Sequence, residues 1–165
     1  MMADSRLYEL AAQTGAALQA RGLVLATAES CTGGWIGEAI TMIPGSSAWY
    51  DRGFITYTNS AKIDMLGVKT VTLDTCGAVS AQTVSEMVAG ALAASGAGVA
   101  VAVSGVAGPG GGTPQKPVGT VCLAWGRKGA SVIAQTRHFS GDREAVRRQT
   151  VVCALEGLLE MLGGA

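Results

Sequence analysis

Hydrophobic residues recur along the start of the chain at the three- and four-residue spacing of an α-helix. This stripe predicts a helix over residues 4–20, and it consists of Leu7, Leu10, Ala11, Thr14 and Leu18. An uninterrupted apolar run at residues 23–26 predicts a buried strand that ends near Ala28. A second helix is expected over residues 33–41, because the pair Pro44-Gly45 stops it.

Strand and helix patterns continue to alternate in the middle of the chain. Residues 48–56 are typical of a strand, which ends at Tyr57. Asn59 can cap a short helix over residues 59–66, and Gly67 marks its end. A longer helix begins at Ser80 and ends near residue 96, with an apolar stripe of Val84, Met87, Val88, Ala91 and Leu92.

The second half of the chain predicts the centre of a sheet. Residues 99–103 are continuously apolar, the pattern of a central strand covered on both faces, and a glycine-rich loop follows at residues 105–112. Residues 118–125 and 131–139 are typical of two strands joined by a turn at residues 126–129. The last helix begins near Asp142, and its apolar face is Val151, Ala154, Leu155, Leu158, Leu159 and Leu162.

This order of segments predicts the fold class. Helices and strands alternate over most of the chain, and one hairpin-like pair of strands follows. The expected fold is an α/β, three-layer α/β/α sandwich with a mixed, mostly parallel sheet that contains an antiparallel strand. Ligands in such sheets lie beyond the carboxyl ends of the strands.

Composition and charge narrow the class of protein. At 165 residues, of which 48% are hydrophobic, residues 1–165 are expected to form one domain with one core. Lys and Arg number 12 and so do Asp and Glu, so no basic excess indicates nucleic-acid binding. The apolar stretches are shorter than the roughly 18 residues of a membrane span, and the start lacks a signal-peptide centre. The four cysteines form no C-x-x-C pair, which favours reduced thiols in the cytoplasm.

The turn at residues 27–34 is the first candidate for chemistry. It places Ser30 and two glycines after a strand and before a helix, where free backbone amides can hold an anion or a developing oxyanion. A serine at such a turn is more often only a helix cap. Cys31 is the stronger nucleophile in principle, but small buried thiols are often inert. The single histidine, His138, would have to serve any Ser-His-Asp triad, and no G-x-S-x-G elbow is present.

Lys62 is the second candidate, because it falls in the first turn of the predicted helix 59–66. Positive charge is disfavoured at a helix N-terminus, and burial would lower the pKa of the amine further. A neutral lysine can act as a general base. The alternative is an ordinary lysine in solvent.

Two further segments are candidate binding elements. The loop at residues 105–112 can bring backbone amides close to a ribose or phosphate, although it is neither a Walker A loop nor a Rossmann motif. Arg143 and Arg147 lie one turn apart at the start of the last helix and suit a phosphate or carboxylate. The alternatives are a flexible surface loop and an exposed helix face. No cluster has metal-ligand spacing, so no metal is expected.

These segments together resemble one family. Residues 29–34, residues 57–62 followed by 66–68, residues 77–80, and residues 105–111 with 116–121 are similar to the C-terminal domain of the CinA family. The resemblance covers nearly the whole chain. It implies an α/β/α sandwich with a mixed sheet, in agreement with the pattern of segments.

The resemblance also implies an activity. The best-known activity of the family is the deamidation of nicotinamide mononucleotide to nicotinate mononucleotide and ammonia, with Ser30, Tyr57 and Lys62 as the implied catalytic residues. Longer CinA proteins carry a further N-terminal domain linked to ADP-ribose pyrophosphatase activity, which these 165 residues do not include. A non-catalytic nucleotide-binding or adaptor module is the alternative.

In this interpretation, amides of the Ser30 turn stabilise the oxyanion, while the glycine-rich loop and the arginines hold ribose and phosphate. The expected substrate-binding residues are Thr32, Gly33, Gly34, Gly105, Ala107, Gly108, Gly110, Arg143 and Arg147. We expect no cofactor and no metal. The expected partners are nicotinamide mononucleotide and further copies of the chain in a homo-oligomer, with no nucleic acid and no membrane.

Overall fold

The computed structural model describes residues 4–163. Helices and strands alternate along the chain as α1 (Ser5–Ala20), β1 (Leu25–Glu29), α2 (Trp35–Thr41), the 3₁₀ turn η1 (Ser46–Ala48), β2 (Tyr50–Ile55), α3 (Asn59–Leu66), α4 (Thr70–Cys76), α5 (Ala81–Ala93), β3 (Val99–Gly105), β4 (Thr120–Arg127), β5 (Ile133–His138) and α6 (Arg143–Gly163). Among the described helices, none combines the length and apolarity needed to cross a membrane.

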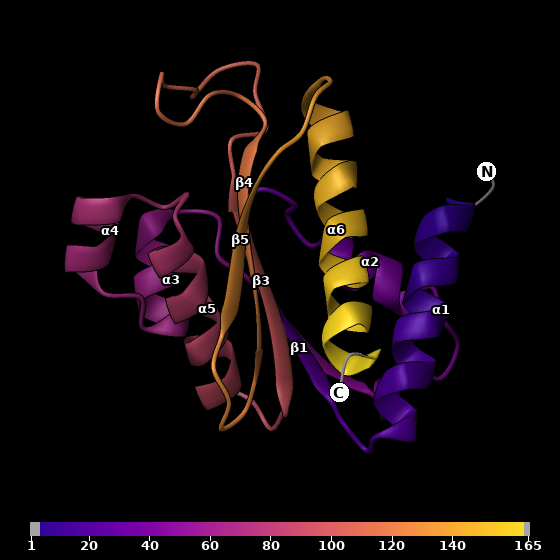
Figure 1. Cartoon of the computed structure of the whole chain (residues 1–165). Helices are drawn as coiled ribbons and strands as arrows, with labels where there is room; N and C mark the ends of the chain where they lie inside the picture. The colour runs from indigo at the N-terminus through magenta and orange to yellow at the C-terminus, as the bar shows by residue number, and fades with distance from the viewer. Residues whose placement is uncertain (1–3, 164–165) are drawn as a thin grey trace.

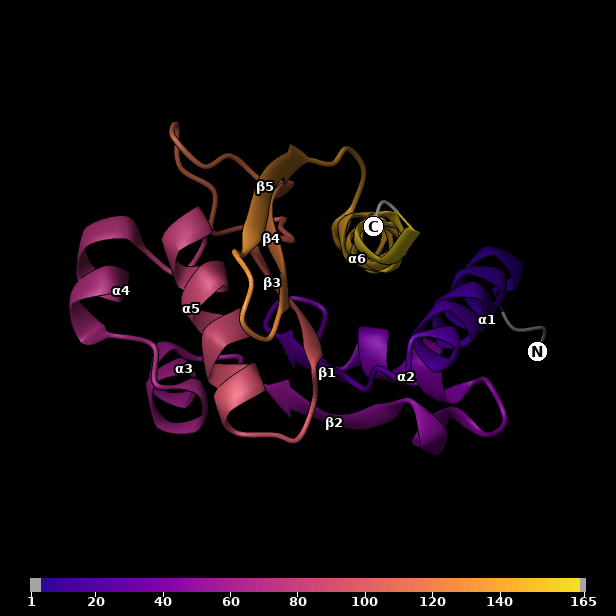
Figure 2. The same ribbon diagram turned by 60° about the horizontal axis from the view of Figure 1, so that its bottom comes forward.

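The strands form a five-stranded mixed sheet in the order β2-β1-β3-β4-β5. β1 pairs in parallel with both β2 and β3, whereas β4 runs antiparallel to β3 and β5. Helices α1, α2 and α6 lie on one side of the sheet, and α3, α4 and α5 lie on the other (Figure 1). The three layers are also clear in Figure 2, where α6 is seen almost end-on beside the sheet. The predicted α/β/α sandwich is therefore confirmed.

Each face of the central strand builds its own core. Val99, Val101 and Val103 of β3 belong to the core shared with α1 and α6, while Ala100 and Ala102 belong to the core under α5. Small side chains on the second face let α5 approach the sheet closely. Both faces of β3 are buried, as its continuous apolar run predicts.

Several predicted boundaries move for local reasons. α2 begins at Trp35 instead of Gly33, because Gly33 and Gly34 adopt φ values of 59° and 106° that an α-helix does not contain. The cap of α3 is Thr58 and not Asn59, since the Thr58 hydroxyl accepts a hydrogen bond from the Ala61 amide at 3.1 Å. β2 begins at Tyr50, after the 3₁₀ turn η1.

One helix was not predicted, and the others match the pattern closely. α4 contains three threonines and a valine, which are β-branched and disfavour helix, and only Leu73 of this helix is buried. By contrast, α5 covers Ala81–Ala93, close to the expected bounds, and Ser80 is its cap, with its hydroxyl accepting from the Thr83 amide at 3.1 Å. Gly67 ends α3 with φ of 67°.

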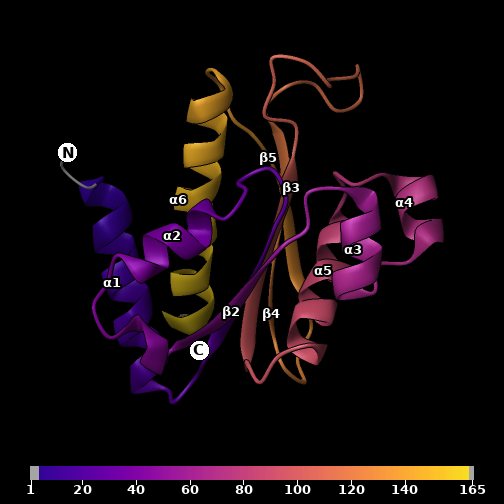
Figure 3. The same ribbon diagram turned by 180° about the vertical axis from the view of Figure 1, so that it is seen from behind.

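The topology brings distant segments to one edge of the sheet. The carboxyl ends of β1, β2 and β3 meet there, together with the start of β4 and the start of α6. The long loop before β4 and the first turn of α6 lie at this edge in Figure 1, and Figure 3 shows the segment between β2 and α3 from behind. This is the edge at which ligands are expected.

Candidate active site

Ser30 directly follows β1 and is fixed by the sheet itself. Its amide donates to the Val103 carbonyl at 3.1 Å, which continues the pairing of β1 with β3. The side chain is 7% exposed. The hydroxyl therefore has a defined position at the carboxyl ends of the strands, and it is almost completely buried.

Lys62 is the group that faces this hydroxyl. Its ammonium nitrogen Nζ donates to Ser30 Oγ at 2.9 Å, to the Thr56 carbonyl at 2.8 Å and to the Tyr57 carbonyl at 3.4 Å. The residue is only 1% exposed. Burial lowers the pKa of the Lys62 amine below its ordinary value. The structure thus brings together Ser30 and Lys62, as predicted, and no carboxylate of residues 4–163 forms a salt bridge with Lys62.

Cys31, the neighbouring nucleophile candidate, is poorly suited to attack. Burial raises the pKa of its thiol to about 11, the nearby Glu29 carboxylate adds to this, and the thiol stays protonated near neutral pH. His138 lies on β5 at the edge of the sheet. Lysine therefore takes the place beside Ser30 that a triad would give to histidine.

Tyr57 contributes to the site in two ways. Its carbonyl accepts the long hydrogen bonds from Lys62 Nζ and from Ser30 Oγ, both at 3.4 Å. Its phenol is 58% exposed, and the hydroxyl accepts from Arg143 Nη2 at 3.0 Å. The phenol is thus paired with Arg143, and no hydrogen bond joins it to Ser30 or Lys62 within residues 4–163.

Arg147 of α6 forms hydrogen bonds with the turn that contains Ser30. Its Nε donates to the Cys31 carbonyl at 3.0 Å and its Nη2 to the Thr32 carbonyl at 3.1 Å. The guanidinium also lies 5.4 Å from the centre of the Trp35 ring, in cation–π distance. Arg147 was expected to bind substrate, whereas the structure directs its guanidinium to the backbone of the turn.

Glu29 holds the same turn from inside. The buried carboxylate accepts from the Thr32 hydroxyl at 2.5 Å and from the amides of Ile36 and Gly37 at 2.9 and 3.1 Å. The Glu29 carboxylate therefore satisfies the free backbone amides in the first turn of α2. This role of Glu29 was not predicted, although Glu29 lies inside the motif that carries the family resemblance.

The three backbone amides that were expected to stabilise the oxyanion, those of Thr32, Gly33 and Gly34, differ in their surroundings. The Gly33 amide donates to the Ser30 carbonyl at 3.1 Å and is therefore engaged. Gly34 lies beside Tyr50 and Ile55, in a depression on the β2 side of the turn. Within the described residues, the Thr32 amide donates to no backbone carbonyl.

A cavity of about 260 Å³ opens over Ser30 and Lys62. Its lining comes from five parts of the chain: Ser30, Cys31, Tyr57, Asn59, Lys62, Ala78, Val79, Ser104, Gly105, Ala107 and Arg143. Gly108 contributes indirectly, because its carbonyl accepts from Arg143 Nη1 at 2.8 Å. Gly110 is not part of this lining. Asn59, Val79 and Ser104 were not predicted to bind substrate, although Asn59 and Val79 lie in motifs quoted for the family.

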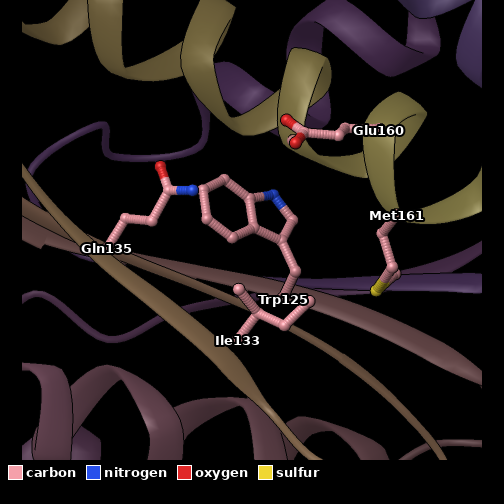
Figure 4. A pocket seen from close by; sticks show the side chains of 6 residues that line it. Trp125, Ile133, Gln135, Glu160 and Met161 are labelled. Carbon is pink, nitrogen blue, oxygen red and sulfur yellow. The ribbon is translucent and has the colours of Figure 1, made fainter. Parts of the chain in front are cut away.

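A different cavity, of about 310 Å³, lies between the sheet and α6 (Figure 4). The Trp125 indole lines it, with the side chains of Gln135 from β5 and Glu160 from α6 nearby. The indole donates to the Ala154 carbonyl at 2.9 Å, so the ring is held as part of the core. This cavity contains neither Ser30 nor Lys62 and is separate from the candidate active site.

Comparisons with known proteins identify the family of this chain. The family model described as CinA C-terminal domain matches residues 7–162. The chain belongs to the CinA C-terminal domain family. Within this CinA family, the "Nicotinamide-nucleotide amidohydrolase PncC" of Pseudomonas putida is 59% identical, covering 92% of this chain and 94% of that protein. The protein of the same name from Escherichia coli K12 is 54% identical, with 95% of each chain covered.

The fold of this CinA domain also matches a solved structure. The crystal structure of the competence/damage inducible protein CihA from Agrobacterium tumefaciens superposes with a TM-score of 0.93 at 49% sequence identity. The alignment covers 99% of each chain. The mixed sheet and its two helical layers are therefore those of the CinA superfamily.

Proposed function

We propose that this chain hydrolyses the carboxamide of nicotinamide mononucleotide, with Ser30 as nucleophile and Lys62 as general base. The observation that carries the proposal is the 2.9 Å contact between Lys62 Nζ and Ser30 Oγ at the floor of a cavity. The names of the Pseudomonas putida and Escherichia coli relatives support the choice of amide. The protein would then be an amidohydrolase of linear carboxamides.

The proposed first step is attack by Ser30. When Lys62 is neutral, its lone pair accepts the hydroxyl proton across the same 2.9 Å contact while Oγ bonds to the carboxamide carbon. We assign the Thr32 amide to the oxyanion, because the Gly33 amide is engaged. Removing one such donor costs about 3 kcal/mol of transition-state stabilisation in related chemistry.

In the remaining steps, Lys62 first acts as a general acid toward the leaving ammonia and then as a general base toward water. Lys62 delivers its proton to the amide nitrogen, the C–N bond breaks, and ammonia leaves an acyl group on Ser30. Water then attacks this ester as Lys62 takes one of its protons. Nicotinate mononucleotide is released when the proton returns to Ser30 Oγ.

The remaining cavity residues would hold the nucleotide. Gly105 and Ala107 present backbone at the end of β3, where a side chain at Gly105 would meet Val121 at 2.6 Å. The exposed Tyr57 ring, paired with Arg143, forms another wall. We propose that these residues contact the pyridine ring and ribose. The catalytic contribution of Tyr57 is then to hold Lys62 through its carbonyl and the substrate through its ring.

The rival function is a nucleotide-binding or adaptor module without catalysis. An ammonia-release assay over nicotinamide mononucleotide, nicotinamide and glutamine separates the two. We expect release from the mononucleotide by the wild-type protein and none by Ser30→Ala. Binding without any release would favour the rival.

We further propose a cytoplasmic role in pyridine nucleotide salvage, carried out by a homo-oligomer. The reaction would return the nicotinate form of the nucleotide for reuse. Light scattering of the purified protein gives the oligomeric state, and a monomer at working concentration would contradict this part.

A further inference from the structure

A second cavity, of about 480 Å³, lies next to the Ser30 cavity. Val79 lines both, so the two spaces meet at the start of α5. The second cavity is closed by Lys116 from the loop before β4 and by His138 from the end of β5. It is large enough for a group that extends from the first cavity.

The ammonium group of Lys116 is fixed by a hydrogen bond and still has donors for a ligand. Its Nζ donates to the Cys76 carbonyl at 2.6 Å, which leaves two of its three N–H groups for another acceptor. Its backbone is part of a hydrogen-bonded turn with Thr113, with contacts of 2.9 and 3.0 Å. Among residues 4–163, no carboxylate lies within salt-bridge distance of Lys116.

The lining of this cavity contains a lysine and no carboxylate. Its polar members include Gln82, Gln115 and His138, and no Asp or Glu belongs to it. A lysine facing such a cavity is a typical phosphate ligand, acting as a point charge.

The alternative position for a phosphate, at the start of α6, is less favourable. A cavity of about 490 Å³ there contains Arg143, but Asp142 and Glu144 line it as well. Two of the Arg143 donors already bind the Gly108 carbonyl and the Tyr57 hydroxyl. The neighbouring carboxylates would repel a phosphate dianion.

We propose that the Lys116 cavity binds the phosphate group of the nucleotide whose carboxamide is cleaved at Ser30. This assignment rests on the proposed function and deepens it, because a bound phosphate would make the nucleotide a better substrate than the free amide. The pyridine ring lies over Lys62, and the chain from ribose to phosphate passes Val79.

The test compares nicotinamide mononucleotide with nicotinamide riboside, which lacks the phosphate. Lys116→Met removes the charge and keeps most of the side-chain length, while Lys116→Arg keeps the charge. Lys128→Met, in the exposed turn after β4, is the matched control. For Lys116→Met we expect KM for the mononucleotide to rise about tenfold to a hundredfold, with KM for the riboside unchanged. Lys116→Arg should recover most of the loss, and the control should behave as wild type.

Three outcomes would overturn the assignment. Equal losses for both substrates would mean that Lys116 only anchors its loop to the Cys76 carbonyl. Unchanged kinetics would exclude contact with the phosphate. The same difference between substrates in Arg143→Met, and not in Lys116→Met, would place the phosphate at the start of α6.

The proposed function can fail separately from this assignment. If wild-type protein releases no ammonia from either substrate, catalysis is refuted. Calorimetric titration of Ser30→Ala and of Ser30→Ala with Lys116→Met, using the mononucleotide and the riboside, then tests the cavity alone. Loss of affinity confined to the mononucleotide supports the phosphate site, and equal affinities for the two proteins overturn it.

Discussion

A buried lysine without a carboxylate partner is uncommon, because the interior penalises its charge. Lys62 is surrounded by the Ser30 hydroxyl and by the carbonyls of Thr56 and Tyr57. These oxygens accept hydrogen bonds from either the charged or the neutral amine, and they do not compensate a full positive charge as a carboxylate would. The environment therefore favours the neutral form, which is the form that a general base requires.

The identity of the nucleophile can be tested by two neighbouring substitutions. Ser30→Ala should abolish ammonia release while affinity for nicotinamide mononucleotide stays within a fewfold of wild type, because the hydroxyl is the attacking atom. Cys31→Ala should keep most of the activity, since its raised pKa leaves the thiol protonated. The measurements are kcat for both variants and calorimetric affinity for Ser30→Ala. An inactive Cys31 variant beside an active Ser30 variant would reverse the assignment.

The role of Lys62 predicts a pH dependence with a definite sign. Activity should rise with pH through the pKa of Lys62, which burial lowers, because the amine must lose its proton to act as a base. Lys62→Arg should be nearly as inactive as Lys62→Met, since arginine keeps its proton to a pH of roughly 12.

The check is kcat/KM against pH for wild type and both variants, with circular dichroism to confirm folding. Near wild-type activity in Lys62→Arg would mean that positive charge alone is sufficient. An acidic limb that persists unchanged in a partly active Lys62→Met protein would belong to another group.

At the scale of elements, α6 supports the nucleophile turn. Arg147 holds the carbonyls of Cys31 and Thr32 at 3.0 and 3.1 Å, so its loss should loosen the turn that carries Ser30. We expect Arg147→Met to lower kcat at least tenfold, with a smaller change in KM for nicotinamide mononucleotide. Arg148→Met, which removes only a surface ion pair with Asp4, is the neighbouring control.

The substrate-binding role first expected for Arg147 predicts a different result. A phosphate ligand at this position would raise KM for the mononucleotide and leave the riboside unaffected, with little change in kcat. Steady-state kinetics on both substrates therefore separates the two roles.

Packing between α3 and α5 gives a prediction for stability. A Cβ at Gly90 would lie only 1.9 Å from the Leu66 carbonyl oxygen, which is backbone and cannot move aside. Gly90→Ala should cost about 3 kcal/mol of unfolding free energy, a fall in Tm of roughly 6–12 °C for a chain of this size. Gly96→Ala is the control, because no atom lies within 4 Å of its added Cβ. Thermal unfolding measures both, and equal Tm values would contradict the packing argument.

For the whole molecule, the sequence predicts the helical and sheet layers better than it predicts individual contacts between residues. Apolar runs such as residues 99–103 identify central strands, because only a strand covered on both faces tolerates them. α4 could not be predicted, since this short helix buries only Leu73 and its threonines and valine favour strands.

For the candidate active site too, only some of the contacts were predictable from the sequence. Ser30 and Lys62 were predictable because a hydroxyl and an amine carry the chemistry in their side chains. The acceptors at Thr56, Cys31 and Thr32 are carbonyls, which every residue has, so no residue type signals them. The Lys116 cavity arises only when the loop before β4 meets the end of α4.

The distribution of ligand-type side chains over the whole molecule leads to a last prediction. Within residues 4–163, no group of three or more His, Cys, Asp and Glu side chains could hold a metal ion. A hydrolytic metal would activate the nucleophile and stabilise the oxyanion, and in the proposed mechanism Lys62 and a backbone amide supply these two effects. Ammonia release should therefore be unchanged after dialysis against EDTA, and added zinc or magnesium should not raise kcat. The assay needs wild-type protein before and after chelation, with Ser30→Ala to give the background rate. Activity that is lost on chelation and restored by a divalent ion would refute the metal-free mechanism and require ligands beyond this site.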